Sequence, residues 1–343
     1  MAMESLQKRW NDWITSLKKK DETTDKDAQI KSAQIVYVFG PPGTGKTFTG
    51  DYMHVMHGYH HVDGDIPLKN IALVPEYKEM IEKCLMSDDW TPMYSELARL
   101  TLEGAKGHDK VVLSHATYKN EYRDHFIKKL IEGGASEDNI IIVQLTIDPK
   151  VKARGLYHRT KRQVEQGGMS LEDLARTSWE WEFEGELTEE KFIELVIEAE
   201  EKDTENVFED HPKAVMVDIS GRDVTHFDNV DKVLGLTRSN ELSYESICAK
   251  VKPIDEARDK ITMANGFFDV IAEIFAKAGN ESLAIEEEGE DEKKVEEMKK
   301  RRSSIVQCEL LVRDISASSL KNSKSGKVLM RRKSLIMTGK IEE

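Results

Sequence analysis

Residues 40–47 have the types and spacing of a site that binds phosphate. They read Gly-Pro-Pro-Gly-Thr-Gly-Lys-Thr and match the pattern G-x-x-x-x-G-K-[ST] of the phosphate-binding loop (P-loop) at every fixed position. Glycines let the backbone turn its N–H groups toward a phosphate, and the following helix adds the positive end of its dipole. We expect Lys46 to reach the β- and γ-phosphates of ATP and the Thr47 hydroxyl to bind Mg²⁺. The candidate nucleotide-binding residues are Gly43, Thr44, Gly45, Lys46, Thr47 and Phe48.

Two carboxylates follow in the segment Val62-Asp63-Gly64-Asp65. They are two residues apart at the expected end of the second strand, where side-chain alternation would direct both to one side. The chain length from Lys46 allows one intervening helix, so both are expected near the transferred phosphate. One could then order the Mg²⁺ shell, while the other orients an acceptor hydroxyl and takes its proton. The alternative is a polar turn, because Asp-Gly is a common turn dipeptide.

The P-loop sequence Gly-Pro-Pro-Gly-Thr-Gly-Lys-Thr is common in AAA-type ATPases, but the second motif of those proteins, an apolar strand that ends in Asp-Glu, is absent here. Those proteins need a second apolar strand that ends in Asp-Glu, to hold Mg²⁺ and activate water. Here the best such strand ends in Leu113-Ser114-His115, and no apolar run followed by Asp-Glu occurs elsewhere. The sequence therefore disfavours an ATP-driven motor.

Short apolar runs alternate with helical patterns along the central part of the chain. This order predicts an α/β fold, a three-layer doubly wound parallel sheet of the P-loop NTPase type, with helical and partly disordered terminal extensions. The predicted strands are Ile35–Phe39, a second ending at Asp63, Lys110–Ser114, Asn139–Ile147 and Ala214–Ile219. The predicted helices include Leu68–Met86, Tyr94–Glu103, Asn120–Gly133 and residues 188–202.

The order of these motifs resembles the gluconate kinase and shikimate kinase group of small-molecule kinases. In gluconate kinases the second strand ends in a Gly-Asp pair, and the third is followed by a Ser-Ala segment and Tyr-Arg-Asp. Here Gly64-Asp65, Ala116 and Tyr122-Arg123-Asp124 match, and the resemblance covers roughly residues 33–236. It implies that Asp65 is the acceptor-orienting base, Asp63 a carboxylate of the Mg²⁺ shell, and Arg123 a ligand of substrate or phosphate. For Arg123, the alternative is a surface ion pair.

Two departures from the gluconate kinase pattern concern the acceptor. Trp90 stands where those enzymes carry an arginine, and the spacing from Ser-Ala to Tyr-Arg-Asp is one residue longer. Since an arginine fork is the natural partner of a carboxylate, its absence weakens the case for a sugar acid. We predict a kinase that uses ATP and Mg²⁺ to phosphorylate a hydroxyl of a small metabolite, such as a sugar acid or polyol. A nucleoside or polynucleotide kinase, and an ATP-binding regulatory or scaffold protein without turnover, remain alternatives.

Residues 151–185 are expected to form a mobile lid. Its arginines would offset the charge that spreads over the γ-phosphoryl oxygens. The candidates are Arg159 and Arg162 as catalytic residues and Arg154, which by resemblance would pack over the adenine ring. Gly167-Gly168 could act as the hinge of the lid.

Composition excludes some classes of function. The 343 residues carry a net charge of −14, which disfavours general nucleic-acid binding. No stretch approaches the roughly 18 apolar residues of a membrane span. The three cysteines are far apart and in no metal-binding spacing, so a cytoplasmic protein is expected.

Around the kinase domain, expected at residues 28–240, three further segments are predicted. Residues 1–27 read as an amphipathic helix and a charged linker, 241–280 as a helical extension, and 281–343 as a charged, flexible tail. The tail contains Arg301-Arg302-Ser303-Ser304 and Arg331-Arg332-Lys333-Ser334, which fit basophilic protein-kinase targets. It is therefore a candidate phosphorylation or partner-binding segment.

Overall fold

A computed structural model of the chain describes most of its central part. The described residues are 24–87, 89–167, 170–178, 181–202, 207–221, 223–238, 242–264, 270 and 274. They fall into two compact units. The sheet unit takes its described residues from Met1–Pro67, Trp90–Ile147 and Phe208–Ala264, and the helical unit takes them from Leu68–Asp89, Asp148–Val207 and Asn265–Glu343.

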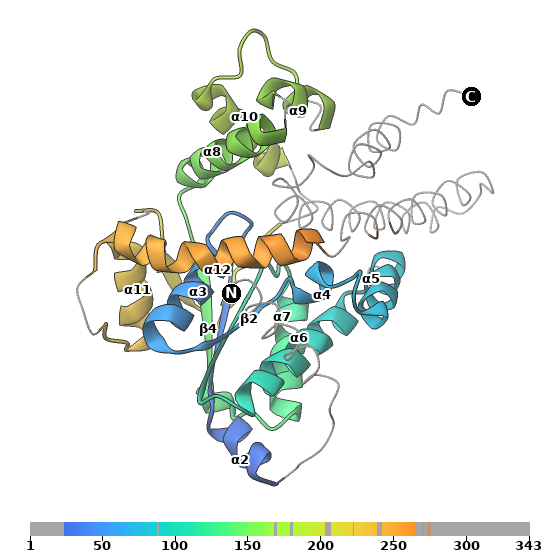
Figure 1. Cartoon of the computed structure of the whole chain (residues 1–343), viewed down its shortest axis with the longest axis vertical. Coiled ribbons are helices and arrows are strands. Elements are labelled where there is room, and N and C mark those ends of the chain that lie inside the picture. The colour runs from blue at the N-terminus through green and yellow to red at the C-terminus, as the bar shows by residue number, and fades with distance from the viewer. Residues whose placement is uncertain are drawn as a thin grey trace, which may run out of the picture. The chain divides into compact units, whose positions relative to one another are not determined.

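The sheet unit is built on five parallel strands in the order β2-β3-β1-β4-β5. Figure 1 labels β2 and β4 and shows helices packed around the sheet. The strands are β1 (Gln34–Phe39), β2 (His60–Asp63), β3 (Lys110–His115), β4 (Ile140–Thr146) and β5 (Val215–Asp218). Each lies within a residue or two of the apolar run that predicted it. A parallel sheet must be covered on both faces, and helices cover this one. The predicted α/β fold is therefore confirmed.

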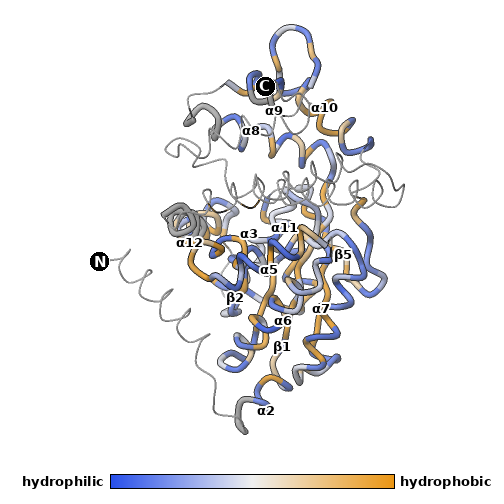
Figure 2. The backbone as a smooth tube through the Cα atoms, turned by 90° about the vertical axis from the view of Figure 1, so that its right-hand side faces the viewer, coloured by the Kyte–Doolittle hydropathy of each residue, from blue (hydrophilic) through white to orange (hydrophobic). Residues whose placement is uncertain are grey.

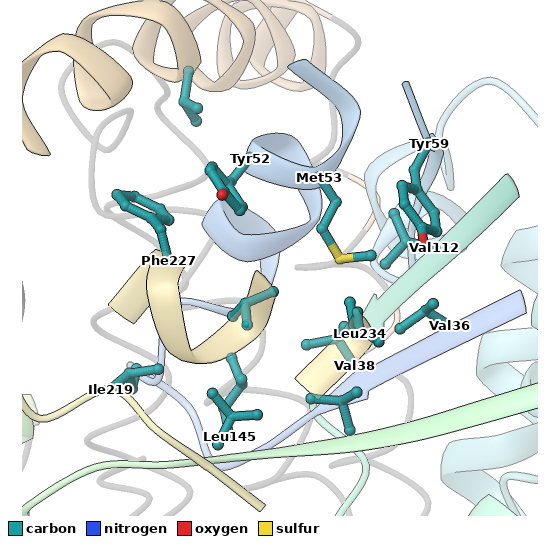
Figure 3. Packing of buried hydrophobic residues seen from close by; sticks show 14 of the residues in the cluster. Val36, Val38, Tyr52, Met53, Tyr59, Val112, Leu145, Ile219, Phe227 and Leu234 are labelled. Carbon is teal, nitrogen blue, oxygen red and sulfur yellow. The ribbon is translucent and has the colours of Figure 1, made fainter. Parts of the chain in front are cut away.

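One face of the sheet packs against α3 (Lys46–His57) and α11 (Val224–Leu234), and α12 (Tyr244–Ala264) packs against α3. Val36 and Val38 of β1 lie in one apolar cluster with Tyr52 of α3 and Phe227 of α11 (Figure 3). Tyr52 and Phe227 stack with ring centroids 4.3 Å apart. This cluster fixes α3, and with it the loop that precedes the helix.

The opposite face packs against α6 (Thr91–Ala105) and α7 (Asn120–Glu132). Tyr37 alternates with Val36 and Val38 along β1, and its ring lies 4.7 Å from that of Phe126 on α7. Hydrophobic and hydrophilic stretches alternate along α7, as in an amphipathic helix (Figure 2). A short helix, α2 (Thr24–Ser32), precedes β1 and begins inside the stretch predicted as a charged linker.

Two helix predictions differ from the structure. The single helix predicted over Leu68–Met86 is wrong, since α4 (Ile66–Lys69) and α5 (Pro75–Ser87) are separate helices. Pro75 has no backbone N–H and disfavours helical geometry at the residue before it, so it starts a new helix. The apolar spacing within the extension predicts an amphipathic helix over Asp255–Lys277, but the helix begins earlier, at Tyr244. Ile247 in its first turn joins the core of the sheet unit.

The helical unit includes α5 and a second group of helices. These are α8 (Pro149–Gly167), α9 (Leu171–Ser178) and α10 (Glu189–Lys202), the last as predicted. Their apolar core contains Ala153 and Tyr157 of α8 and Phe192 of α10, with the Tyr157 and Phe192 rings 5.4 Å apart. The predicted lid segment therefore has a core of its own.

Some predictions concern residues outside the described ranges. These are the amphipathic helix before residue 24, the charged tail from residue 281, and its candidate phosphorylation sites. Within the described part of the chain, no helix is both long and apolar enough to cross a membrane.

Candidate functional site

The P-loop connects β1 to α3, as the sequence predicts. Gly43 and Gly45 have φ angles of 81° and 69°, in the left-handed region that favours glycine. A Cβ at Gly40 would lie 2.8 Å from the carbonyl oxygen of Leu145, so this turn also needs a glycine. α3 begins at Lys46, directly after the loop, and its first N–H groups are therefore available to an anion.

The loop is closed by hydrogen bonds to one carbonyl oxygen. Lys46 Nζ and Thr44 Oγ1 each donate to the Pro41 carbonyl at 2.8 Å. Lys46 is only 9% exposed. When a nucleotide binds, a negatively charged phosphate oxygen could replace the Pro41 carbonyl as the acceptor for the Lys46 ammonium group. Thr47 follows in the first turn of α3 and is half-buried.

Asp63 and Asp65 follow β2, which belongs to the same sheet as the P-loop strand β1. β3 separates β2 from β1, and Asp63 is the register partner of Ser114 on β3. Asp63 ends β2 at 4% exposure, whereas Asp65 follows in a turn with its side chain 21% exposed. The Asp65 N–H donates to Asp63 Oδ1 at 3.1 Å. The polar turn considered for Asp-Gly is thus present, and it carries Asp65.

His115, at the end of β3, is a site residue that the sequence motifs did not single out. It is 3% exposed, and its Nε2 lies 3.8 Å from Asp65 Oδ1. Burial, and then the positive charge of Lys46, lower the pKa of His115 to about 3, while Asp63 acts in the opposite direction. The imidazole is therefore neutral near pH 7. Its position at the end of an apolar strand was the signal available in the sequence.

A chain of buried polar groups supports this edge of the sheet. His61 Nδ1 hydrogen-bonds Asp51 Oδ1 at 2.7 Å, and its Nε2 hydrogen-bonds Ser114 Oγ at 2.8 Å. The order Ser-His-Asp is that of a hydrolase triad, but Ser114 is only 2% exposed and no substrate can reach it. The network joins α3 to β2 and β3, and therefore fixes the strand ends next to the P-loop.

Arg123 is fully buried on α7. Its guanidinium donates to the carbonyl oxygens of Thr117, Tyr118 and Glu209 and to the Asn120 side chain. These bonds use all five N–H groups of the side chain, so none is left for a substrate in this conformation. The arrangement gives Arg123 a structural role. Its part in binding substrate or phosphate stays a prediction.

Trp90 is also buried, at 6% exposure, where it precedes the first turn of α6. It therefore contributes to the packing of the sheet unit at the position where a gluconate kinase has arginine.

The predicted lid arginines lie on α8 of the helical unit. Arg154 Nε donates to Glu189 Oε1 at 2.8 Å, and His158 approaches the same carboxylate at 3.5 Å. Arg159 is half-buried on the same helix, and Arg162 lies one turn further along it. Gly167 ends α8, and Gly168 is outside the described residues. The roles of these arginines stay predictions.

The residues predicted to hold Mg²⁺ have suitable chemistry. The Thr47 hydroxyl and the Asp63 carboxylate are hard oxygen donors. The described residues contain no group of three or more His, Cys, Asp or Glu side chains that could hold a metal ion alone. Mg²⁺ at a phosphate site fits this pattern, because it is bound by one or two protein groups together with water and substrate phosphates.

A P-loop between the central strand of a parallel sheet and the following helix defines the P-loop NTPase fold. Among solved structures, a gluconokinase from Sinorhizobium meliloti 1021 is similar to this chain. The TM-score is 0.30 and the sequence identity 19%, over 66% of this chain and 95% of that chain. No family model and no curated protein sequence matches the chain. The function therefore has to be inferred from the residues of the site.

Proposed function

We propose that this protein is an ATP-dependent phosphotransferase that moves the γ-phosphate onto a hydroxyl group of a small metabolite. One observation carries the proposal: the P-loop and the Asp63/Asp65 pair follow the carboxyl ends of strands that belong to one parallel sheet. Ligands of such sheets bind at this edge. A carboxylate beside a phosphate-binding loop is the group needed to direct a hydroxyl at the γ-phosphate.

The P-loop N–H groups and Lys46 would bind the β- and γ-phosphates. Thr47 and Asp63 would hold Mg²⁺, which supplies positive charge against the phosphate oxygens when it is bound. Asp65 would accept the proton of the acceptor hydroxyl as the new O–P bond forms. The bond between the γ-phosphorus and the bridging oxygen of ADP breaks in the same step. Arg159 and Arg162 of the lid are proposed to offset the charge that develops on the γ-phosphoryl group.

The test is ADP release in the presence of ATP, Mg²⁺ and candidate acceptors. The panel contains sugar acids, polyols, shikimate-like acids and nucleosides, and Lys46→Ala serves as the blank. We expect at least one class of acceptor to stimulate ADP release in the wild-type chain, with a phosphate monoester as the product in phosphorus NMR. If every class left ADP release at the level of the blank, the protein would be better described as an ATP-binding regulatory protein.

A further inference from the structure

One buried polar atom at the proposed site has no assigned role. His115 Nε2 has no hydrogen-bond partner among the residues that the structure describes, although the side chain is only 1% exposed. A buried polar group without a partner is costly, and such groups are retained where a ligand completes them. The nearest carboxylate oxygen, Asp65 Oδ1, is 3.8 Å away, which is too far for a direct hydrogen bond.

The position of the His115 ring is fixed by its neighbours. The ring of Tyr94 meets it edge to face, with centroids 5.6 Å apart. A Cβ at Gly64 would lie 2.5 Å from His115 Cβ, so the chain carries a glycine where the two strand ends meet. His115 Nδ1 is 3.1 Å from Thr117 Oγ1. Nε2 therefore keeps its orientation toward the side of Asp65.

The same contacts favour one tautomer of the ring. Tyr37 donates to Thr117 Oγ1 at 2.6 Å, and burial raises the pKa of Tyr37, so its hydroxyl keeps its proton. The proton of the Thr117 hydroxyl is then available for donation to His115 Nδ1, 3.1 Å away. In this arrangement the neutral imidazole carries its proton on Nε2.

We propose that His115 and Asp65 together bind the attacking hydroxyl of the phosphate acceptor. The acceptor oxygen lies between them, accepts a hydrogen bond from Nε2–H and donates its proton to the Asp65 carboxylate. A hydroxyl oxygen has one proton and two lone pairs, so one lone pair remains free to attack the γ-phosphorus. The inference deepens the proposed function and rests on it.

The paired groups select the chemical class of the acceptor. A protonated amine has no lone pair for Nε2–H, and a carboxylate has no proton for Asp65. Of these three groups, only the alcohol satisfies both His115 and Asp65. In the transfer step the hydroxyl proton passes to Asp65, the O–P bond forms and ADP leaves, while His115 keeps its proton throughout.

The first test measures the tautomer of His115 in the wild-type protein by NMR on ¹⁵N-labelled histidine. The resonance is identified by its absence in His115→Gln. We expect protonation at Nε2 and not at Nδ1. Protonation at Nδ1 would overturn the proposal, because Nε2 could then not donate. This measurement needs no acceptor, and the variant serves only to assign the resonance.

The second test compares His115→Gln with His115→Asn. The glutamine amide reaches the position of Nε2, whereas the asparagine amide reaches only that of Nδ1. With D-glucitol or D-gluconate as the probe, we expect the acceptor kcat/KM to fall about 10- to 100-fold in His115→Asn. The fall in His115→Gln should be under about threefold, and KM for ATP should change by less than about twofold in both variants. Equal losses in the two variants would overturn the role of Nε2.

A third comparison tests the selection of alcohols. An amine analogue, 1-amino-1-deoxy-D-glucitol, should be phosphorylated on its hydroxyl groups and never on nitrogen, and N-phosphorylation would contradict the proposal. If no acceptor in any panel is phosphorylated, the proposed function fails by itself. The tautomer then still supports or overturns the assignment of His115.

Discussion

Asp63 and Asp65 are two residues apart, but their environments differ. Asp63 is 4% exposed and accepts the Asp65 N–H, whereas the Asp65 side chain is 21% exposed and faces His115 Nε2 across 3.8 Å. A buried carboxylate at a strand end suits a fixed ion, while a more accessible one suits an exchanging substrate. At the residue scale, this difference separates the two roles.

We expect Asp65→Asn to lower kcat by about 10²- to 10⁴-fold, because the amide cannot accept the hydroxyl proton. The affinity for ATP should stay within about twofold of the wild type. Asp63→Asn should instead raise the Mg²⁺ concentration needed for half-maximal activity. Steady-state kinetics at varied Mg²⁺ checks both. Unchanged turnover in Asp65→Asn would show that Asp65 is not the base.

A second prediction at this scale concerns Gly64. An added methyl group would lie 2.5 Å from His115 Cβ, so Gly64→Ala must displace either the imidazole or the turn that carries Asp65. We expect a loss of about 1–3 kcal/mol of unfolding free energy, together with a lower acceptor kcat/KM. Gly107→Ala is the matched control, since a methyl group added there would have no heavy atom within 4 Å. Denaturant unfolding of both variants gives the comparison, and equal stabilities would contradict it.

At the scale of elements, the packing of β2 against α6 depends on a neutral histidine. His60 stacks on His108 with ring centroids 4.5 Å apart, and a Cβ at Gly104 of α6 would lie 2.7 Å from its ring. Burial, and then the nearby histidines His108, His61 and His54, lower the pKa of His60 from 6.5 to about 4. The folded state therefore excludes the charged form of this side chain.

This shift predicts how stability depends on pH. Between about pH 4 and 6.5 the unfolded chain binds a proton at His60 that the folded chain does not bind. Stability is thus fully present above pH 6.5 and falls as the pH drops, by about 1.4 kcal/mol per unit from this group. In His60→Phe, the difference in unfolding free energy between pH 7.5 and pH 5 should shrink by about 2 kcal/mol. Urea titrations at the two pH values measure it, and an unchanged difference would argue against a lowered pKa.

At the scale of the whole molecule, the chain divides into a sheet unit and a helical unit, each with its own apolar cluster. Phe192 is fully buried in the helical unit, where it packs against Tyr157 and Trp181. The nucleotide-binding loop belongs to the sheet unit. Damage to the core of one unit is therefore expected to remain local.

We expect Phe192→Ala to destabilise the helical unit by about 3–5 kcal/mol through the cavity that it leaves. Hydrogen exchange should accelerate over residues 149–202 and stay slow in β1, β3 and β4. Binding of a fluorescent ATP analogue should be retained, while phosphoryl transfer falls if the lid arginines act in it. Accelerated exchange throughout both units would show that they unfold together. Phe126→Ala, in the sheet unit, provides the reciprocal control.

The sequence by itself determined the features that depend on neighbouring residues. The P-loop is a local pattern, and the positive φ angles of Gly43 and Gly45 follow from its glycines. The five strands could be predicted because buried parallel strands are continuous apolar runs. Asp63 and Asp65 could be selected because they follow such a strand. The break between α4 and α5 was also encoded in the sequence, at Pro75.

Only the tertiary structure decided which strand ends meet. The order β2-β3-β1-β4-β5 brings Ser114 and His115 beside Asp63 and Asp65, although about 50 residues separate the two pairs. It also joins Asp51 to His61 and Ser114, and it uses every donor of Arg123 inside the fold. These contacts depend on strand register and on burial from both faces of the sheet. Neither property is encoded in a short segment. His115 could therefore be assigned a role only from the structure, where its Nε2 has no hydrogen-bond partner among the described residues and faces Asp65.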